Sequence, residues 1–252
     1  IAAPHLALAQ TFQLSYRATS HGGPITGRAF LFVARTDRQE PRLQSGAQRE
    51  SEPFFGVDVE ALAPGKVVTI DPSVPGFPVA SLAKLPAGDY YVQALLLPYT
   101  RFKRSDGHTI WAHMDAGEGQ RFNRSPGSLV SEVRKVRIDP ARNPTVRLTL
   151  TKVIPPIPSP TERQWVKRVR ITSKLASAFW GHPMPLGAVV LLPKGYAENT
   201  TKRYPVVYTI GHFSERPSFG FTFEGCDRPE TPEAREARLK RSMREPGCEF
   251  QQ

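Results

Sequence analysis

The sequence predicts a mainly β protein, in which an N-terminal antiparallel β-sandwich precedes a proline-rich linker and a second part. Two observations predict this class. The chain has 25 prolines and 19 glycines among 252 residues, and such frequent turn residues favour short strands over long helices. Short apolar runs also recur from residue 11 to residue 153, and several alternate apolar with polar side chains as half-buried strands do.

Seven such runs precede the linker. They are Thr11–Ala18, Gly27–Ala34, Gly65–Ile70, Asp89–Leu97, Thr109–Met114, Leu129–Ile138 and Thr145–Lys152. About seven short antiparallel strands are typical of an immunoglobulin-like sandwich, although this region lacks the paired cysteines and core tryptophan of an antibody domain. We therefore expect an accessory domain of this type over residues 11–153.

The turn before the fourth run leads into an aromatic strand. Leu85–Ala94 resembles a strand common in extracellular immunoglobulin-like and carboxypeptidase-regulatory-like modules. Successive strand side chains point to opposite faces, so Tyr90 and Tyr91 are expected to divide between core and surface. The longest polar loops, Gly46–Phe55 and Gly117–Ser128, are candidate contact surfaces for a carbohydrate or another polypeptide.

A linker over residues 154–163 is predicted from four prolines within residues 155–160, which hold the chain extended. Beyond it, Gln164–Thr172 alternates as a strand and Gly187–Leu192 is its expected hairpin neighbour. Pro205–Ile210 is the expected third strand. Its near-continuous apolar run suits a strand that is covered on both faces.

One helix is expected near the C-terminal end, beginning at Thr231 and continuing to Arg244. Thr231 is a suitable N-cap, Pro232 suits the first helical position, and Glu233 places an acid in the first turn. These three residue types in this order are a common helix start.

The second part carries a family resemblance. Ser173–Leu175, Phe179–Gly181, Pro185–Tyr196 and Tyr204–Tyr208 resemble the N-terminal part of the esterase D-like and enterochelin-esterase-like branch of the α/β-hydrolases. In that branch, "VLLPxGY…YPVVY" marks the second and third sheet strands. The resemblance implies that residues 164–252 are an incomplete α/β-hydrolase segment and that the complete protein hydrolyses a small ester substrate through a serine.

The resemblance assigns no catalytic side chain to this chain. The family's nucleophile lies in G-x-S-x-G, followed by an acid and a histidine, and the sequence contains no G-x-S-x-G. We expect these three residues beyond the end of the given chain. One oxyanion-hole donor is implied at the backbone amide of His212 or Phe213, unless Gly211 simply turns the chain. A His212–Ser214 pair is not expected, because residues two apart in a loop rarely align as base and nucleophile.

The net charge of +11 does not by itself predict nucleic-acid binding. The basic residues are spread through the chain, and their densest clusters are Arg101–Arg104, Arg134–Arg137, Lys167–Arg170 and Arg235–Arg244. The second and third clusters alternate with Val or Ile as half-exposed strands do. No nucleic-acid-binding motif accompanies them, so nucleic acid is not an expected partner, and a polyanion remains a weaker alternative. No run of apolar residues is long enough to span a membrane.

No cofactor or metal site is predicted. His108 and His113 flank Trp111, and their spacing on a strand places them on opposite faces, which disfavours joint metal ligation. The two cysteines, Cys226 and Cys248, form a disulfide if the protein is exported, or remain a free pair.

The first ten residues contain Ala7-Leu8-Ala9, a pattern typical of signal-peptidase cleavage, so residues 1–10 are interpreted as a signal-peptide remnant or a disordered tail. Export to the periplasm or the extracellular space is expected. The sequence therefore predicts the N-terminal portion of a secreted serine carboxylic-ester hydrolase that is inactive alone. The alternative is an exported, non-catalytic β-sandwich that binds a carbohydrate or a protein.

Overall fold

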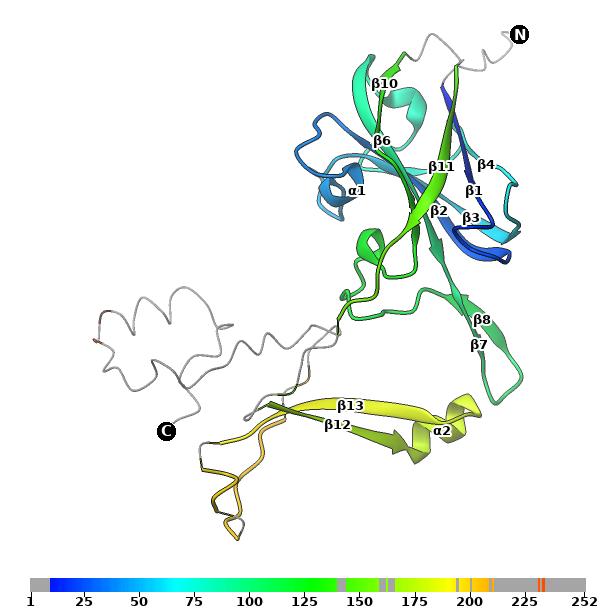
Figure 1. The fold of residues 1–252 in the computed structure, drawn as a ribbon. Helices are drawn as coiled ribbons and strands as arrows, with labels where there is room; N and C mark the ends of the chain where they lie inside the picture. The colour runs from blue at the N-terminus through cyan, green and yellow to red at the C-terminus, as the bar shows by residue number, and fades with distance from the viewer. Residues whose placement is uncertain are drawn as a thin grey trace, which may run out of the picture. The chain divides into compact units, whose positions relative to one another are not determined.

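The computed structural model describes residues 10–139, 144–158, 162, 166–193, 195–199, 201–208, 210, 231 and 233 (Figure 1). The chain divides into two compact units, Ile1–Pro158 and Ser159–Gln252, and the division falls inside the proline-rich stretch. The described secondary structure is mainly β. Among the described residues, no helix is long and apolar enough to cross a membrane.

The first unit combines short strands with very short helical segments. Its strands are β1 Thr11–Tyr16, β2 Ile25–Ala34, β3 Phe54–Leu62, β4 Val68–Ile70, β5 Gly76–Phe77, β6 Gly88–Pro98, β7 Thr100–Lys103, β8 Thr109–Ala112, β9 Leu129–Ser131, β10 Arg134–Ile138 and β11 Thr145–Val153. Its helical segments are α1 Pro41–Gln44, η1 Leu82–Lys84 and η2 Phe122–Arg124. Each of the seven predicted runs contains a strand, whereas β3, β5 and β7 were not predicted.

Nine of these strands form one sheet in the order β4-β1-β11-β9-β6-β2-β3-β5, with β10 attached to β6. Pairing is antiparallel except between β1 and β11, which run parallel with Thr11 opposite Thr145 and Tyr16 opposite Leu150. This pair differs from the expected fully antiparallel arrangement. Parallel strands need a long connection, and nearly the whole unit separates these two.

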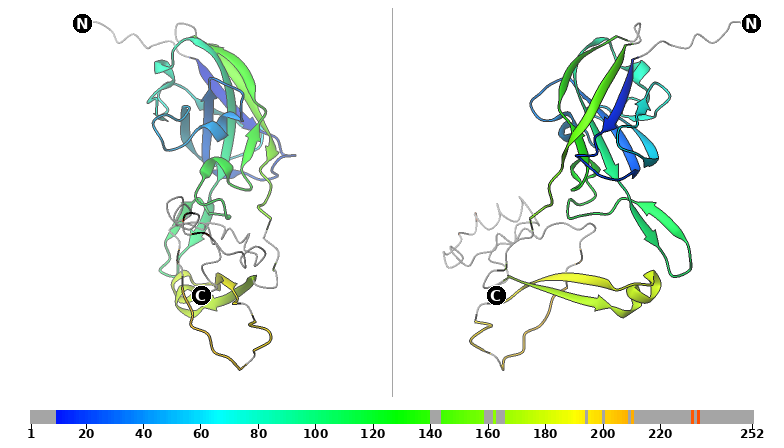
Figure 2. Two further views of the ribbon diagram at one scale, coloured as in Figure 1. Left: turned by 90° about the vertical axis from the view of Figure 1, so that its left-hand side faces the viewer. Right: turned by 45° about the vertical axis from the view of Figure 1, so that its right-hand side comes forward.

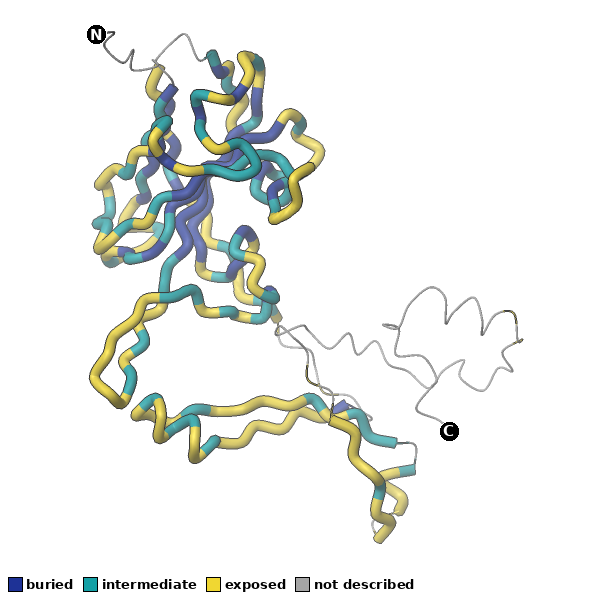
Figure 3. Tube along the Cα trace, turned by 180° about the vertical axis from the view of Figure 1, so that it is seen from behind, coloured by how far each residue is buried: buried dark blue, intermediate teal, exposed yellow. Residues whose placement is uncertain are grey.

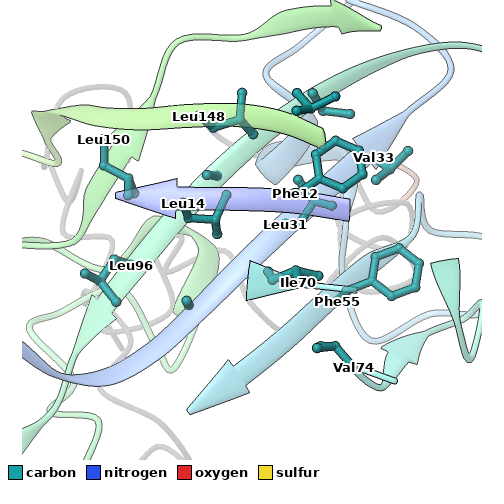
Figure 4. Packing of buried hydrophobic residues seen from close by; sticks show 14 of the residues in the cluster. Phe12, Leu14, Leu31, Val33, Phe55, Ile70, Val74, Leu96, Leu148 and Leu150 are labelled. Atoms are coloured by element: carbon teal, nitrogen blue, oxygen red, sulfur yellow. The ribbon is translucent and has the colours of Figure 1, made fainter. Parts of the chain in front are cut away.

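The sheet curls so that β4, β1 and β11 lie over β6, β2 and β3 (Figure 2). Alternate side chains of both layers meet in between, where Phe12, Leu14 and Leu148 from one layer pack with Leu31 and Phe55 from the other (Figure 4). Burying each such side chain stabilises the fold by about 1.5–3 kcal/mol. The alternation that is visible in the sequence therefore becomes the inward face of a shared core.

The outer face of β2 is apolar as well, which explains its continuous run of apolar residues. Phe30 and Phe32 point away from the main core and join Leu95 and Leu97 in a second cluster. The η2 segment covers this cluster through Phe122, whose ring centroid lies 4.8 Å from that of Phe30. Strand β2 is thus covered on both faces, as continuous apolar strands usually are.

A β-bulge divides the predicted strand Leu129–Ile138 into β9 and β10. Both pair antiparallel with β6, but Val130 lies opposite Leu95 whereas Arg134 lies opposite Val92, so the register shifts by one residue. At this shift the backbone amide of Ala94 donates to Ser131 Oγ at 2.9 Å. A side chain thus satisfies a backbone donor at the irregularity in the ladder.

Tyr90 and Tyr91 divide between core and surface, which confirms the sequence prediction. Tyr90 is buried and its hydroxyl donates to the carbonyl of Pro86 at 2.8 Å, at the turn that precedes β6. Burial raises the pKa of Tyr90. Tyr91 lies on the outer face, where the ammonium of Lys135 is 5.9 Å from its ring centroid.

A polar network ties α1 to β6 and η2. Glu40 Oε2 accepts hydrogen bonds from Arg42 Nε at 2.8 Å and Gln93 Nε2 at 2.7 Å. Asn123 Nδ2 donates to the carbonyl of Arg42, and Arg42 Nη1 donates to the carbonyl of Asn123. Burial raises the pKa of Glu40, but the hydrogen bonds and the charges of Arg42 and Lys152 outweigh it, so this pKa lies below its ordinary value.

The second unit contains a hairpin of β12, Val166–Ser173, and β13, Met184–Leu191, joined through helix α2, Lys174–Trp180. The two strands pair antiparallel from Val166 opposite Leu191 to Ser173 opposite Met184, which confirms the predicted hairpin. The sequence did not predict α2. Its ends nonetheless carry ordinary caps, since Ser173 Oγ accepts from the amide of Ala176 and Gly181 adopts a φ of 72°.

The prediction of a third strand at Pro205–Ile210 is wrong for the residues that the structure describes. Among its described residues, 205–208 and 210, none is in a strand, and the side chains of Val206, Val207, Tyr208 and Ile210 are exposed. An apolar run becomes a covered strand only where neighbouring strands and a facing layer are present. The described strands of this unit are β12 and β13 alone.

Only two residues of the predicted C-terminal helix are described. Glu233 is helical and Thr231 precedes it outside the helix. Hydrogen bonds from the backbone amide of Glu233 and from Thr231 lower the pKa of the Glu233 carboxyl. This arrangement agrees with an N-cap at Thr231, and the remainder of the predicted helix lies outside the described residues.

Candidate binding surface

Strands β7 and β8 form a hairpin that continues from the end of β6 and extends away from the large sheet (Figure 1). Arg101 pairs with Trp111, and Phe102 pairs with Ile110. Directly paired residues of antiparallel strands share a face, so Arg101 and Trp111 lie on one face with Lys103, while Phe102 and Ile110 lie on the other.

A tight turn closes this hairpin through Asp106. The backbone amide of His108 donates to Asp106 Oδ1 at 3.1 Å, and Arg104 Nη2 lies 2.7 Å from Asp106 Oδ2. Gly107 has a φ of 88°, a conformation that glycine adopts without strain. The amide of His108, its ring and the guanidinium of Arg104 stabilise the carboxylate, so the pKa of Asp106 lies below its ordinary value.

Most of the β7–β8 hairpin is exposed, as the burial colours of the tube show (Figure 3). Trp111 is 48% exposed, Ile110 43% and Met114, just after β8, 54%. Trp111 and Ile110 lie on opposite faces, so both faces of the hairpin present apolar surface to solvent. A tryptophan ring beside cationic side chains offers a flat apolar surface together with charge.

The loop after β8 is held by two carboxylates. Glu118 Oε1 lies 2.6 Å from His113 Nε2, and Glu118 Oε2 accepts from the amide of Ala116 at 2.7 Å. Asp115 Oδ1 accepts from the amides of Gly117 and Gly119. The side chain of Glu118 is 2% exposed, so this contact with His113 is a buried anchor at the base of the hairpin.

The described histidines do not form a metal centre. His108 lies beside Asp106 and His113 beside Glu118, so each contacts its own carboxylate. Both histidines lie just outside β8, Thr109–Ala112, and not on the strand where the sequence placed them. Among the described residues, no group of three or more His, Cys, Asp or Glu side chains lies close enough to hold a metal ion.

The prediction that Gly46–Phe55 and Gly117–Ser128 are polar contact loops is wrong in part. Gly46–Phe55 ends in β3, whose Phe55 is fully buried, because Phe55, Val57 and Val59 alternate as a strand facing the core. Within Gly117–Ser128, Phe122 covers the second apolar cluster and Asn123 joins the polar network. Neither segment is therefore a wholly solvent-facing polar loop.

The basic clusters Arg134–Arg137 and Lys167–Arg170, both predicted on half-exposed strands, differ in the burial of the strands that carry them. In β10, Lys135 and Arg137 lie on the outer face near Asp89, as a half-exposed strand predicts. In β12, by contrast, every residue from Lys167 to Thr172 is exposed, so that cluster does not lie on a half-buried strand.

Several predicted site residues cannot be placed. The oxyanion-hole candidates His212 and Phe213 and the cysteines Cys226 and Cys248 lie outside the described residues. Of the predicted signal-peptide remnant or disordered tail at residues 1–10, only Gln10 is described, and it is buried. The chain matches no protein-family model, and comparisons with curated proteins and with solved structures return no match.

Proposed function

We propose that the second unit begins the catalytic domain of a secreted serine carboxylic-ester hydrolase, and that the first unit is its immunoglobulin-like accessory domain. The observation that supports this proposal is the β12–β13 hairpin, whose second strand contains Pro185–Leu191 of the esterase D-like resemblance. The turn that follows also agrees, since Gly195 has a φ of 76° and the amide of Tyr196 donates to the carbonyl of Pro193. The described residues of Tyr204–Tyr208, the last part of that resemblance, are not in a strand.

The immunoglobulin-like assignment of the first unit is supported by two features. Its sheet curls into two facing layers around one core. In addition, the hydroxyl of Tyr90 bonds the backbone four residues upstream at the start of β6, which resembles the tyrosine corner of immunoglobulin-like sandwiches.

In this proposal the catalytic serine, acid and histidine are not among the 252 residues, which contain no G-x-S-x-G. The 252-residue chain should then fail to hydrolyse a p-nitrophenyl ester, whereas a longer product of the same gene that contains G-x-S-x-G should hydrolyse it and be inactivated by a serine-directed phosphonate. Steady hydrolysis by the 252-residue chain that a phosphonate abolishes would place the nucleophile within it and contradict the proposal.

A second candidate function is carbohydrate binding by the first unit without catalysis, and the exposed Trp111 face favours it. The full chain should bind a subset of a glycan array. Trp111→Ala should weaken that binding at least about tenfold, since exposed tryptophans often dominate a binding interface. Tyr196→Ala is the matched control, because Tyr196 is 46% exposed but belongs to the second unit. Binding that survives Trp111→Ala would exclude the hairpin as the contact surface.

A further inference from the structure

Two neighbouring strands of the first unit separate and leave a fork in its sheet. Strand β9 lies between β11 and β6, and its pairing with β11 begins at Leu150 opposite Ser131. Past the bulge, β10 stays with β6. In the described part of the chain, β10 pairs only with β6, and residues 145–149 of β11 pair only with β1.

A cavity of about 210 Å³ lies where the fork begins, lined by residues that include Ser131, Arg134, Arg147 and Thr149. Arg134 Nη1 donates to the backbone carbonyl of Arg147 at 3.3 Å. The Arg134 guanidinium thus donates a hydrogen bond to a backbone carbonyl on the edge of β11 that faces the fork. No described strand pairs with that edge over residues 145–149. The side chain of Arg134 therefore spans the fork from β10 to β11.

The charges beside the fork are mostly positive. Arg134, Lys135 and Arg137 are exposed on β10. On the β6 side an acid balances two of them, since Asp89 lies opposite Arg137 and its carboxylate is 3.5 Å from Arg137 Nη1 and 4.0 Å from Lys135 Nζ. The other edge of β10 offers the same cations to a strand placed there.

We propose that the free edge of β10 binds an extended acidic segment of another polypeptide by strand addition. Backbone hydrogen bonds to an open edge supply affinity in this mode of recognition, and alternate side chains supply specificity. Cationic side chains on an edge disfavour pairing with neutral or basic strands. A segment with Asp or Glu at alternate positions instead places its acids beside Lys135 and Arg137. Acidic, basic and acidic side chains then lie next to one another on β6, β10 and the added strand.

The binding probe is a short fluorescent peptide in which Glu alternates with Val, added to the full chain. We expect saturable binding by fluorescence anisotropy, together with slower hydrogen exchange at the backbone amides of β10. A peptide of equal charge in which proline replaces each Val cannot pair as a strand, because proline lacks the amide donor. It should bind at least about tenfold more weakly.

Two double variants test the position of the site. Lys135→Glu with Arg137→Glu should weaken binding of the Glu–Val peptide by about tenfold or more, because two favourable cross-strand pairs become repulsive. Lys66→Glu with Lys84→Glu makes the same change in net charge at exposed positions elsewhere on the unit and should leave binding within about twofold. Equal weakening by both variants, equal binding of the proline peptide, or no binding of the Glu–Val peptide would overturn the proposal.

Discussion

Strands β11 and β12 have similar sequences and very different surroundings. Both alternate apolar side chains with Thr, Lys or Arg. In β11, Val146, Leu148 and Leu150 are buried, because a second layer faces them. In β12, Val169 and Ile171 are 45% and 59% exposed. An alternating pattern thus predicts the strand, and the presence of a facing layer decides whether that strand acquires a core.

The same contrast separates the two units in energetic terms. The first unit buries a continuous cluster from both layers. The hairpin of the second unit leaves Leu175, Phe179 and Leu186 exposed as well. A two-stranded hairpin is at best marginally stable in water without a packed face. We therefore expect matched substitutions in the two units to differ strongly, with the first unit always more sensitive.

The largest expected difference is between Leu31→Ala and Leu186→Ala. Leu31 is fully buried and Leu186 is 52% exposed, so the same deletion creates a cavity only in the first unit. Leu31→Ala should lower the free energy of unfolding of the first unit by about 3 kcal/mol. Leu186→Ala should change stability by less than about 0.5 kcal/mol. Urea unfolding followed by circular dichroism measures both, and equal losses would remove the contrast.

Next in size is a pair of glycine substitutions within strands. A Cβ at Gly27 would overlap the backbone carbonyl of Leu97 on β6, whereas a Cβ at Gly187 in β13 meets nothing within 4 Å. Gly27→Ala should destabilise by about 2 kcal/mol through overpacking. Gly187→Ala should stay within about 0.5 kcal/mol of the parent chain. Thermal unfolding of both variants tests this, and a neutral Gly27→Ala would show that β2 and β6 can separate without cost.

A smaller effect is expected from removing the hydroxyl of Tyr90. Tyr90→Phe loses the hydrogen bond to Pro86, which should lower the stability of the first unit by about 1 kcal/mol. Tyr196→Phe removes a hydroxyl from an exposed residue of the second unit and should have a smaller effect. Chemical denaturation curves give both values, and the idea fails if the two changes are the same.

The smallest expected effect is the acid sensitivity that Glu40 confers. The pKa of Glu40 in the folded protein lies below the ordinary glutamate value. The carboxylate therefore contributes fully to the free energy of unfolding above the ordinary pKa, and this contribution is lost as the pH falls through the lowered pKa. The carboxylate is partly exposed, so the contribution should stay below about 1 kcal/mol. Glu40→Gln should flatten the pH profile of stability in this acid range. Glu60→Gln, at an exposed position, should leave the profile as in the parent chain.

The sequence predicted most strands of the first unit because their inward faces alternate with period two. It missed β3, although Phe55, Val57 and Val59 carry the same period, because the polar residues before them suggested a loop. It also presented Leu129–Ile138 as one strand. The bulge there depends on how β6 is shared between β9 and β10, which local sequence does not encode.

The candidate binding surface was only partly predictable. The strand at Thr109–Met114 and the cationic run at Arg101–Arg104 are visible in the sequence. That they form a separate hairpin with Trp111 exposed is not, because exposure depends on whether another layer covers the strand. The anchor between His113 and Glu118 depends in the same way on the path of the intervening loop.

The parallel pairing of β1 with β11 has a mechanical consequence. These are the first and last described strands of the unit, and they pair residue for residue from Thr11 with Thr145 to Tyr16 with Leu150. Tension applied between the start of β1 and the segment after Val153 pulls the two strands past each other along their length. All the hydrogen bonds between them then carry the load together, instead of opening one after another. We expect single-molecule stretching to show that this domain resists force strongly, with its force peak lowered when Gln13→Pro removes a backbone amide that faces β11.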